Sequence, residues 1–435
     1  MRRGSALHPA GGSPQVGSDA WLLLGSRALR MLGIGVMVVT LPLYLSRVGL
    51  SAIEVGSVLT CGMAGGAVAT LGFGRAAEVF GRRTALKIAA LAPAVGAVLL
   101  LTQSAVGILA FAAFIGGVSA SGQDVGPPQA LEQAAIADLL GPGARRFAWY
   151  GLAGSLSLAF GSLLAGAVAT ASQGRASGPY PPLIALYAAT SVAAFCLYAF
   201  LGPAVEAAAD GPGRKRMRAP LGPSRRRVKE LAALYSVDSM AGGVGAQSLV
   251  AYYFHLRFGL QLDVIGPLLF LANLAAAGSQ LVAATLAERF GLLRTMVFTH
   301  LPSDILLALV PLMPWWPLAA AVLVARQSIS QMDVPTRQAY TMAMVTPAER
   351  TATASATGAA RTVGAALGPI IGGSLVTGVL PGLNLLAAGG VKAAYDLVLY
   401  RRFKSVPLLP PASRPPTGLP EPGPDRPGDG SPPVL

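Results

Sequence analysis

Apolar stretches of about 20 residues recur along the whole chain, and short polar segments separate them. A stretch of this length crosses the ~30 Å hydrocarbon layer of a bilayer as an α-helix, because each residue adds about 1.5 Å. No pattern typical of a sheet interrupts the series. It therefore predicts an all-α membrane protein with twelve transmembrane helices, at residues 19–45, 52–73, 84–103, 105–126, 146–171, 181–203, 231–255, 263–286, 293–313, 315–335, 351–378 and 381–400.

A charged phrase occurs twice among the polar segments. Residues 75–87 read RAAEVFGRRTALK and residues 285–297 read TLAERFGLLRTMV, so that Glu78 falls on Glu288 and Gly81 on Gly291 at an offset of 210. At an offset of 209, DVGPPQA from Asp124 falls on DVPTRQA from Asp333. A duplication explains both matches. We therefore expect two six-helix repeats that lie parallel to each other.

The remaining polar segments predict the domain organisation. We expect a disordered N-terminal tail at 1–18, a first six-helix bundle at 19–203 and a basic cytoplasmic linker at 204–230. A second bundle follows at 231–403, and the Pro-rich residues 404–435 form a disordered tail.

Composition and charge agree with a membrane protein. With 53% hydrophobic and 12% charged residues, the chain has too few charges for a soluble protein of 435 residues. If the N-terminus is inside, most Lys and Arg residues fall in cytoplasmic segments, and the outer loops hold only Arg47, Arg175 and Arg257. We therefore attribute the net charge of +14 to the orientation of the chain in the membrane and not to nucleic-acid binding. We expect a multi-pass protein of the plasma (inner) membrane with both termini cytoplasmic.

The segment GRAAEVFGRR, from Gly74 to Arg83, resembles the loop 2–3 signature of the major facilitator superfamily. Glu78 replaces the commoner Asp of this signature, and Ala76 replaces the usual Leu. The second copy is degenerate, because Ala284 stands where Gly would and the basic pair is lost. The resemblance implies a secondary transporter with the superfamily's twelve-helix fold and a substrate site between the halves.

The repeated phrase predicts a latch on the cytoplasmic side. Its glycines let the loop turn and let helices 2 and 11 approach closely. Glu78 would contact the start of helix 11 at Arg350, and Glu288 would make the mirror contact near Arg145 and Arg146. The resemblance also implies that a loop arginine, Arg82, pairs with an acid ending helix 4, Asp124. Topogenic charges without a latch are the alternative. The candidate gating residues are Gly74, Glu78, Gly81, Arg82, Arg83, Asp124, Arg145, Arg146, Glu288, Gly291 and Arg350.

Ionisable residues within the predicted spans are functional candidates, because each costs at least ~2.5 kcal/mol in hydrocarbon. We expect Arg27 or Arg30 to pair with Asp238 across the two halves; snorkelling of both arginines to the cytoplasmic face is the alternative. His300 and Asp304 share a face of helix 9 around Pro302 and could carry a coupling proton, although helix 9 is usually peripheral in this superfamily.

Helices 10 to 12 contribute further charged candidates. Arg326 lies seven residues before Asp333 on one face of helix 10, and it could contact an anion, gate the passage or form a structural salt bridge. Lys392 and Asp396 are spaced to pair with each other on helix 12. The candidate substrate and coupling residues are Arg27, Arg30, Asp238, His300, Asp304, Arg326, Asp333, Arg361, Lys392 and Asp396.

Several function classes are disfavoured. Neither HExxH nor GxSxG nor a Walker A pattern is present, so we expect no enzymatic activity, no metal, no cofactor and no ATP coupling. We expect a secondary active transporter that moves a small molecule by alternating access, as proton-coupled efflux of an amphiphilic compound. Uptake or exchange of an anionic metabolite bound by Arg326 and Arg361, or a non-transporting membrane sensor, are the alternatives. The expected partners are the substrate, the lipid bilayer and protons, and the expected state is a monomer.

Overall fold

A computed structural model of the chain describes residues 14–124, 126–140, 144–176, 178–206, 222, 224–346, 349–377 and 380–406. All regular elements of these residues are helices, and the predicted all-α fold is confirmed. The first half contains α1 (Pro14–Arg47), α2 (Ala52–Phe80), α3 (Arg82–Thr102), α4 (Val106–Gly116), α5 (Pro127–Leu140), α6 (Ala144–Ala171), α7 (Tyr180–Ala199) and the short η1 (Pro203–Val205).

The second half follows the same order. It contains α8 (Arg225–Val244), α9 (Gln247–Phe258), α10 (Leu262–Phe290), α11 (Leu292–Leu309), η2 (Val310–Leu312), α12 (Trp316–Ser330), α13 (Asp333–Ala343), α14 (Arg350–Val376) and α15 (Leu383–Phe403). Eight helices in the described residues are long and apolar enough to cross a membrane. Helices suit this environment because they satisfy their own backbone hydrogen bonds.

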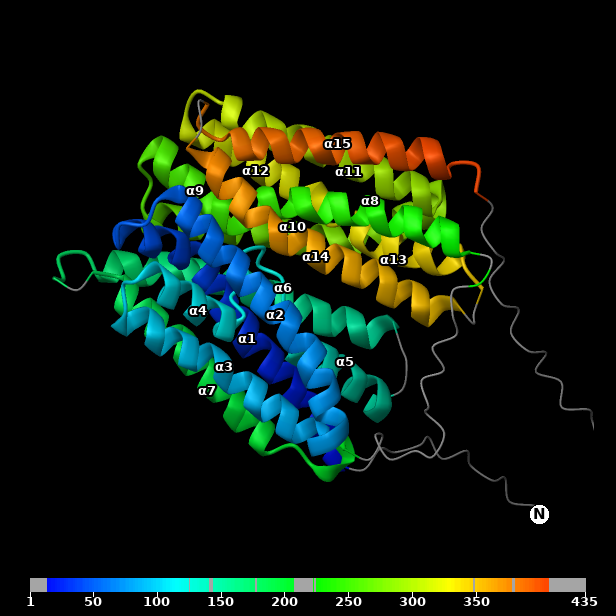
Figure 1. Cartoon of the computed structure of the whole chain (residues 1–435), viewed down its shortest axis with the longest axis horizontal. Coiled ribbons are helices and arrows are strands. Elements are labelled where there is room, and N and C mark those ends of the chain that lie inside the picture. Colours follow the sequence, from blue (N-terminus) through cyan, green and yellow to red (C-terminus); the bar gives the residue numbers. More distant parts are fainter. Residues whose placement is uncertain are drawn as a thin grey trace, which may run out of the picture.

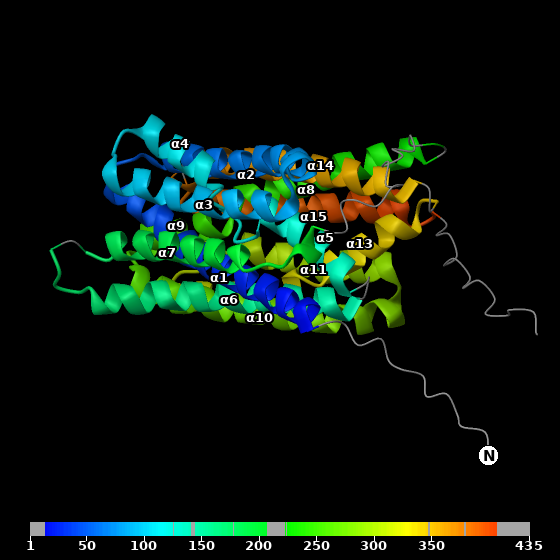
Figure 2. The same cartoon turned by 90° about the horizontal axis from the view of Figure 1, so that it is seen from below.

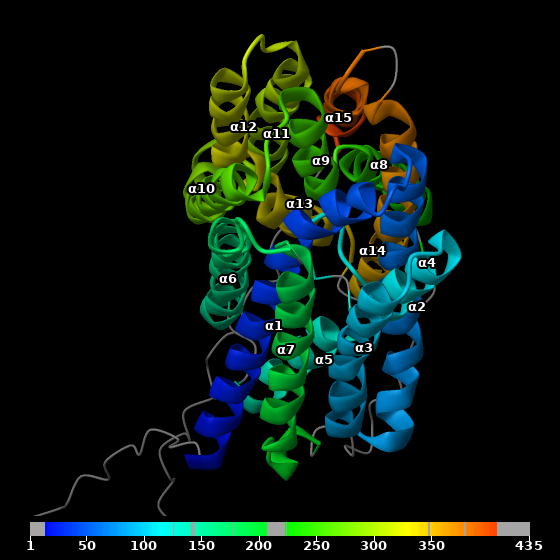
Figure 3. The same cartoon turned by 90° about the vertical axis from the view of Figure 1, so that its left-hand side faces the viewer.

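The two halves form two groups of helices that lie against each other. Figure 3 shows α10, α11, α12 and α15 on one side and α1, α3, α6 and α7 on the other. Helix α1 begins and α15 ends at the same end of the molecule, on the right in Figures 1 and 2, and we call this the termini end. We call the opposite end the loop end.

Three predicted spans are each divided into two helices. The predicted helix at 105–126 is wrong in its extent: α4 ends at Gly116, and α5 starts at Pro127 and runs to Leu140. Gly117 adopts a left-handed conformation (φ 57°), which ends α4, and a proline suits the first position of α5. The other two divisions fall between α8 and α9 and between α12 and α13.

The two glycines of the repeated phrase adopt the same backbone conformation. Gly81 joins α2 to α3 with φ 84° and ψ 153°, and Gly291 joins α10 to α11 with φ 84° and ψ 155°. This conformation favours glycine because a side chain would be strained. A Cβ atom at Gly81 would also lie 2.8 Å from the carboxylate of Glu206, which accepts from the backbone N–H of Arg82 at 2.7 Å. The duplicated glycines therefore make the duplicated turn.

The start of α8 is held by one carboxylate at the termini end. Glu349 accepts from the backbone N–H of Gly222 at 2.8 Å and from the hydroxyl of Ser224 at 2.9 Å. The hydroxyl of Thr346 donates to it at 2.9 Å. Burial raises the pKa of Glu349, but these hydrogen bonds outweigh burial and leave the pKa below its usual value. The clamp is thus formed above that pKa and weakens when acid protonates the carboxylate.

The halves touch through small residues near the loop end. Gly56, four residues into α2, packs against Gly373, three residues before the end of α14. Gly166 of α6 packs against Gly266, near the start of α10. Without side chains at these positions the helix backbones come close enough for van der Waals contact. By contrast, a Cβ atom at Gly74, nearer the termini end of α2, would meet open space, so the expected close approach at Gly74 is wrong for this conformation.

Substituting Gly266 by Val should open the loop end. A Cβ atom there would lie 2.6 Å from the carbonyl oxygen of Ser162 and 2.8 Å from the Cα atom of Gly166, so the helices must separate. We expect the free energy of unfolding in mixed micelles to fall by about 1–3 kcal/mol. The control is Gly278→Val in the same helix, where a Cβ atom meets nothing within 4 Å. Equal loss in both variants would contradict the close contact.

Candidate functional site

The first half buries a neutral cluster of two arginines and two carboxylates. Arg27 and Arg30 of α1 both donate to Asp124, at 2.5 and 2.8 Å. Arg30 also forms a two-bond contact with Glu132 of α5, at 2.9 and 2.8 Å. Such forked contacts are strong and fix the guanidinium plane. The interruption between α4 and α5 positions Asp124, which lies in it, beside α1.

Two tyrosines complete this first-half cluster. The hydroxyls of Tyr150 on α6 and Tyr198 on α7 donate to Glu132 at 2.5 and 2.6 Å. The guanidinium of Arg27 lies 4.6 Å from the ring centre of Tyr150, where a cation–π interaction stabilises it. The cluster therefore joins four helices, and its charges balance within its own half.

The second half buries a larger set of charges, the second-half cluster. Asp238 of α8 contacts Lys392 of α15 through one carboxylate oxygen and Arg337 of α13 through the other, the latter at 3.1 Å. Arg337 also contacts Asp333, one turn earlier on α13, at 2.9 Å. All four side chains are less than one-tenth exposed.

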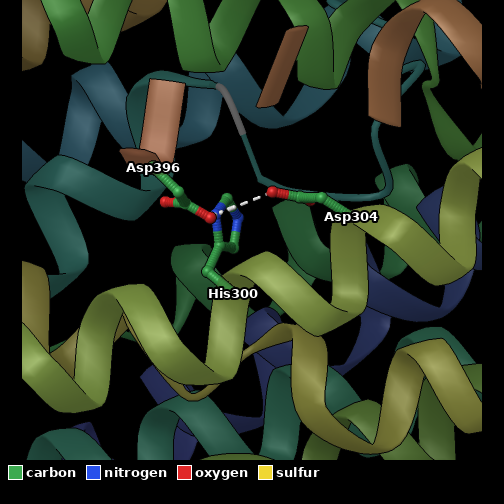
Figure 4. Close-up of side chains that lie close together, drawn as sticks. All are labelled: His300, Asp304 and Asp396. Atoms are coloured by element: carbon green, nitrogen blue, oxygen red, sulfur yellow. Dashed lines mark hydrogen bonds and ion pairs between the residues drawn. The ribbon is translucent and has the colours of Figure 1, made fainter. Parts of the chain in front are cut away.

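One histidine nitrogen is shared by two carboxylates in this second-half cluster (Figure 4). The Nδ1 atom of His300 lies 3.1 Å from Asp304 on the same helix, α11, and 3.0 Å from Asp396 on α15. Asp304 is fully buried, and neither of its oxygens has a hydrogen bond of good geometry in the described residues. A single ring nitrogen therefore faces two acids inside the protein.

The first and fourth helices of each half are joined by ion pairs of opposite polarity. In the first half the arginines lie on α1 and the carboxylate, Asp124, lies at the interruption of helix 4. In the second half the carboxylate, Asp238, lies on α8. The arginine, Arg337, lies on α13, which follows the interruption between α12 and α13. Of the repeat-related aspartates, Asp124 lies in the interruption between α4 and α5, and Asp333 is the first residue of α13. At the repeat offset of 209, Arg337 corresponds to Pro128 and not to Asp124, so the two contacts join corresponding spans through different positions, with their charges reversed.

Several predicted pairings are wrong. Arg27 and Arg30 do not pair with Asp238; they pair within their own half, because the interruption of helix 4 brings Asp124 to them. Neither arginine snorkels, since both are buried. Lys392 contacts Asp238 instead of Asp396, which contacts His300.

Two more expected contacts are replaced by local ones. Arg82 contacts Asp138 at 3.1 Å and not Asp124, because helix 4 continues to Leu140 as α5 and ends beside the loop. Arg326 and Asp333 do not share a continuous helix face, since Gln331 and Met332 separate α12 from α13. Arg326 donates to Gln327 at 2.5 Å, and Asp333 contacts Arg337.

Glu132, Tyr150 and Tyr198 were missed as site residues. The predicted span ended at residue 126, which left Glu132 in a loop although it is fully buried. An acidic residue in the apolar segment ALEQAAIADLL was the available signal, since such a residue needs a buried partner.

The predicted cytoplasmic latch stays a prediction. The side chains of Glu78, Arg145 and Arg146 lie outside the described residues. Glu288 is exposed, and Arg350 is half-buried with no hydrogen-bond partner for Nε in the part of the chain described.

His300, Asp304 and Asp396 are also the group in the described residues whose donor atoms lie within 4.8 Å of one another, as metal ligands would. Lys392 and Arg326 carry positive charge near Asp304, which disfavours a further multivalent cation. The donor set fits a proton better than a metal ion.

Comparison with known proteins identifies the family. The sequence profile of the Major Facilitator Superfamily matches residues 23–329. The uncharacterized membrane protein YJR124C of Saccharomyces cerevisiae is 25% identical over 426 residues, which cover 89% of this chain and 94% of the yeast protein. The protein is therefore a multi-pass membrane protein and a member of the Major Facilitator Superfamily.

Solved structures show the same fold. The nucleoside transporter NupG is similar with a TM-score of 0.71 at 13% identity, covering 89% of this chain and 99% of that one. The inward-open xylose transporter XylE of E. coli has a TM-score of 0.65 at 17% identity, covering 91% and 96%. The human organic anion transporter MFSD10 has a TM-score of 0.60 at 15% identity, covering 89% and 100%. These likenesses concern the fold alone.

Replacing Glu132 by Gln should destabilise the protein strongly. The change leaves Arg30 buried with one carboxylate fewer, and removing one partner of a buried ion pair costs about 3–5 kcal/mol. Unfolding in mixed micelles would measure the loss. The control is Glu230→Gln, whose exposed partner Arg226 makes a surface pair worth no more than about 0.5 kcal/mol. A Glu132 variant as stable as this control would contradict the described network.

Proposed function

We propose that the protein is a proton-coupled secondary transporter that works by alternating access, and that His300 with Asp304 and Asp396 carries the coupling proton. The observation that supports this most is the single Nδ1 atom facing two buried carboxylates. Histidine is suited to the task, because its charge changes within the physiological pH range.

Protonation of His300 would change the contact between α11 and α15. Protonated imidazole carries a positive charge that both carboxylates attract. Neutral imidazole has no net charge, so the two carboxylates then repel each other without a positive charge between them. The helices that carry Asp304 and Asp396 are thus held together more weakly once the proton leaves.

The contacts between the halves support an alternating-access motion. Each close glycine contact between them lies in the part of its helices nearer the loop end, and the hydroxyl of Thr60 accepts from the backbone N–H of Ile370 in the same region. With the termini cytoplasmic, as the distribution of Lys and Arg favours, this conformation is closed toward the outside. The motion would exchange these contacts for contacts at the termini end.

Interrupted helices at the centre support a substrate site there. Residues 117–124 of the interruption between α4 and α5 are not helical, and the backbone carbonyl of Ala120 accepts from the N–H of Ser248 at the start of α9. Transporters place such interruptions where they line a cavity between the halves. Export of an amphiphilic compound across the plasma membrane by a monomer, without enzymatic activity, stays a prediction.

Transport into liposomes with luminal pH as the readout tests this proposal. Substrate movement should acidify or alkalinise the lumen in the wild type, and His300→Gln should abolish proton movement or reduce it by about 100-fold or more, because glutamine has no titratable group. His255→Gln, near the loop end and outside the second-half cluster, should behave as the wild type. Substrate flux with unchanged proton movement in His300→Gln would contradict the proton role. No flux of amphiphiles, anions or neutral solutes would favour the sensor.

A further inference from the structure

We propose that Arg361 binds the transported substrate and that this substrate is a small organic anion with a carboxylate or a similar oxyanion. This inference rests on the proposed transport function and adds the substrate class to it. Five observations of the described residues carry it: the depth of Arg361, its partial exposure, the absence of a carboxylate paired with it, its two terminal nitrogens without a partner, and the balance of the surrounding charges.

Arg361 lies deep in the membrane and is only partly buried. It is 11 residues from the start of α14, which places it about 16 Å along the helix. The apolar part of this helix runs from Ala352 to Val376 and is long enough to span the bilayer. An arginine at this depth faces the protein interior or a water-filled passage, because exposure to lipid is costly. The contact of Arg361 with α8 places it at the junction of α8 and α14.

Arg361 has no counter-ion in the described part of the chain. Its Nε atom donates to the hydroxyl of Ser239 on α8 at 3.3 Å, and no ion pair joins it to a carboxylate. The strongest electrostatic influence on it is repulsion by Arg337, whereas Asp238 and Asp333 attract it more weakly. An uncompensated guanidinium inside a membrane is costly unless an anion joins it during the working cycle.

Two nitrogens of the guanidinium are left for a planar oxyanion. Ser239 holds the Nε side of the fork, and the terminal Nη1 and Nη2 atoms have no partner among the described residues. These two nitrogens present parallel N–H groups, which match the two oxygens of a carboxylate. Lysine could supply the charge but not this two-bond contact.

Arg361 is one positive charge more than the surrounding charged side chains need for balance. In the second-half cluster the aspartates Asp238, Asp304, Asp333 and Asp396 are balanced by Arg326, Arg337, Lys392 and protonated His300. In the first-half cluster Arg27 and Arg30 are balanced by Asp124 and Glu132. With all four aspartates ionised and His300 protonated this set is neutral, and Arg361 then adds one positive charge to it.

This balance couples an anion to the proton. A bound monoanion neutralises the charge that is present when both Arg361 and His300 are positive, so each ligand should favour the other, and the effect must be reciprocal. The pair would cross the membrane as proton and anion together, without net charge movement.

Binding of matched acids and amides to the purified protein tests the inference without any gradient. The probes are lactate, benzoate and indole-3-acetate, each compared with its neutral amide, and the readout is calorimetric binding in lipid nanodiscs. We expect at least one acid to bind and its amide not to bind. Arg361→Gln should weaken that binding by about 10- to 100-fold, as expected for loss of a charged hydrogen-bonded contact. Arg361→Lys should recover part of it.

Two further variants separate binding from structure. Arg401→Gln removes an exposed arginine at the end of α15 and should leave binding unchanged. Ser239→Ala should weaken binding less than Arg361→Gln, because it removes only the group that orients the guanidinium. Equal binding of acid and amide, equal binding in Arg361→Gln and wild type, or no binding of any acid would overturn the inference. The proton role of His300 is tested separately by luminal pH, so the two proposals can fail independently.

Discussion

An unpaired charge inside a membrane is the constraint on which the interior of this protein depends. Charged side chains from α1, α8, α11, α13 and α15 lie at membrane depth, and each would cost several kcal/mol if left alone. The structure meets this cost by bringing opposite charges from different helices together. Arg30 contacts Glu132 and Asp124, and Asp238 contacts Lys392 and Arg337. These ion pairs specify which helices of a half lie together.

The same constraint separates structural from functional charges. The first-half cluster contains no histidine, and its two arginines balance its two carboxylates when all four side chains are charged. In the second-half cluster, four ionised aspartates face Arg326, Arg337 and Lys392, so when a bound anion neutralises Arg361 the cluster is neutral only if His300 carries a proton. Gain or loss of a proton at His300 therefore changes the charge balance of the second-half cluster and leaves the first-half cluster as it is. The contacts between helices of the second half are thus the ones that protonation can alter.

The repeat and the charged residues could be predicted from the sequence, but their contacts could not. The offset of 210 found Gly81 and Gly291, which make the same turn in both halves. The hydropathy pattern identifies buried charges such as Arg27, but the sequence alone predicts Arg82 as the partner of Asp124. Hydropathy does not reveal where a transmembrane helix unwinds, and the interruption after Gly117 decides which helix Asp124 faces. Glu132 was missed for the same reason.

The protonation state of His300 decides whether this residue can carry a coupling proton. The chain has three histidines, so ¹⁵N-histidine NMR of the protein in nanodiscs can assign His300 by comparison with His300→Gln. We expect His300 to change between a ring protonated on both nitrogens at low pH and a neutral ring at high pH. A ring that stays neutral, or stays charged, over the whole range in which the protein is folded would contradict it.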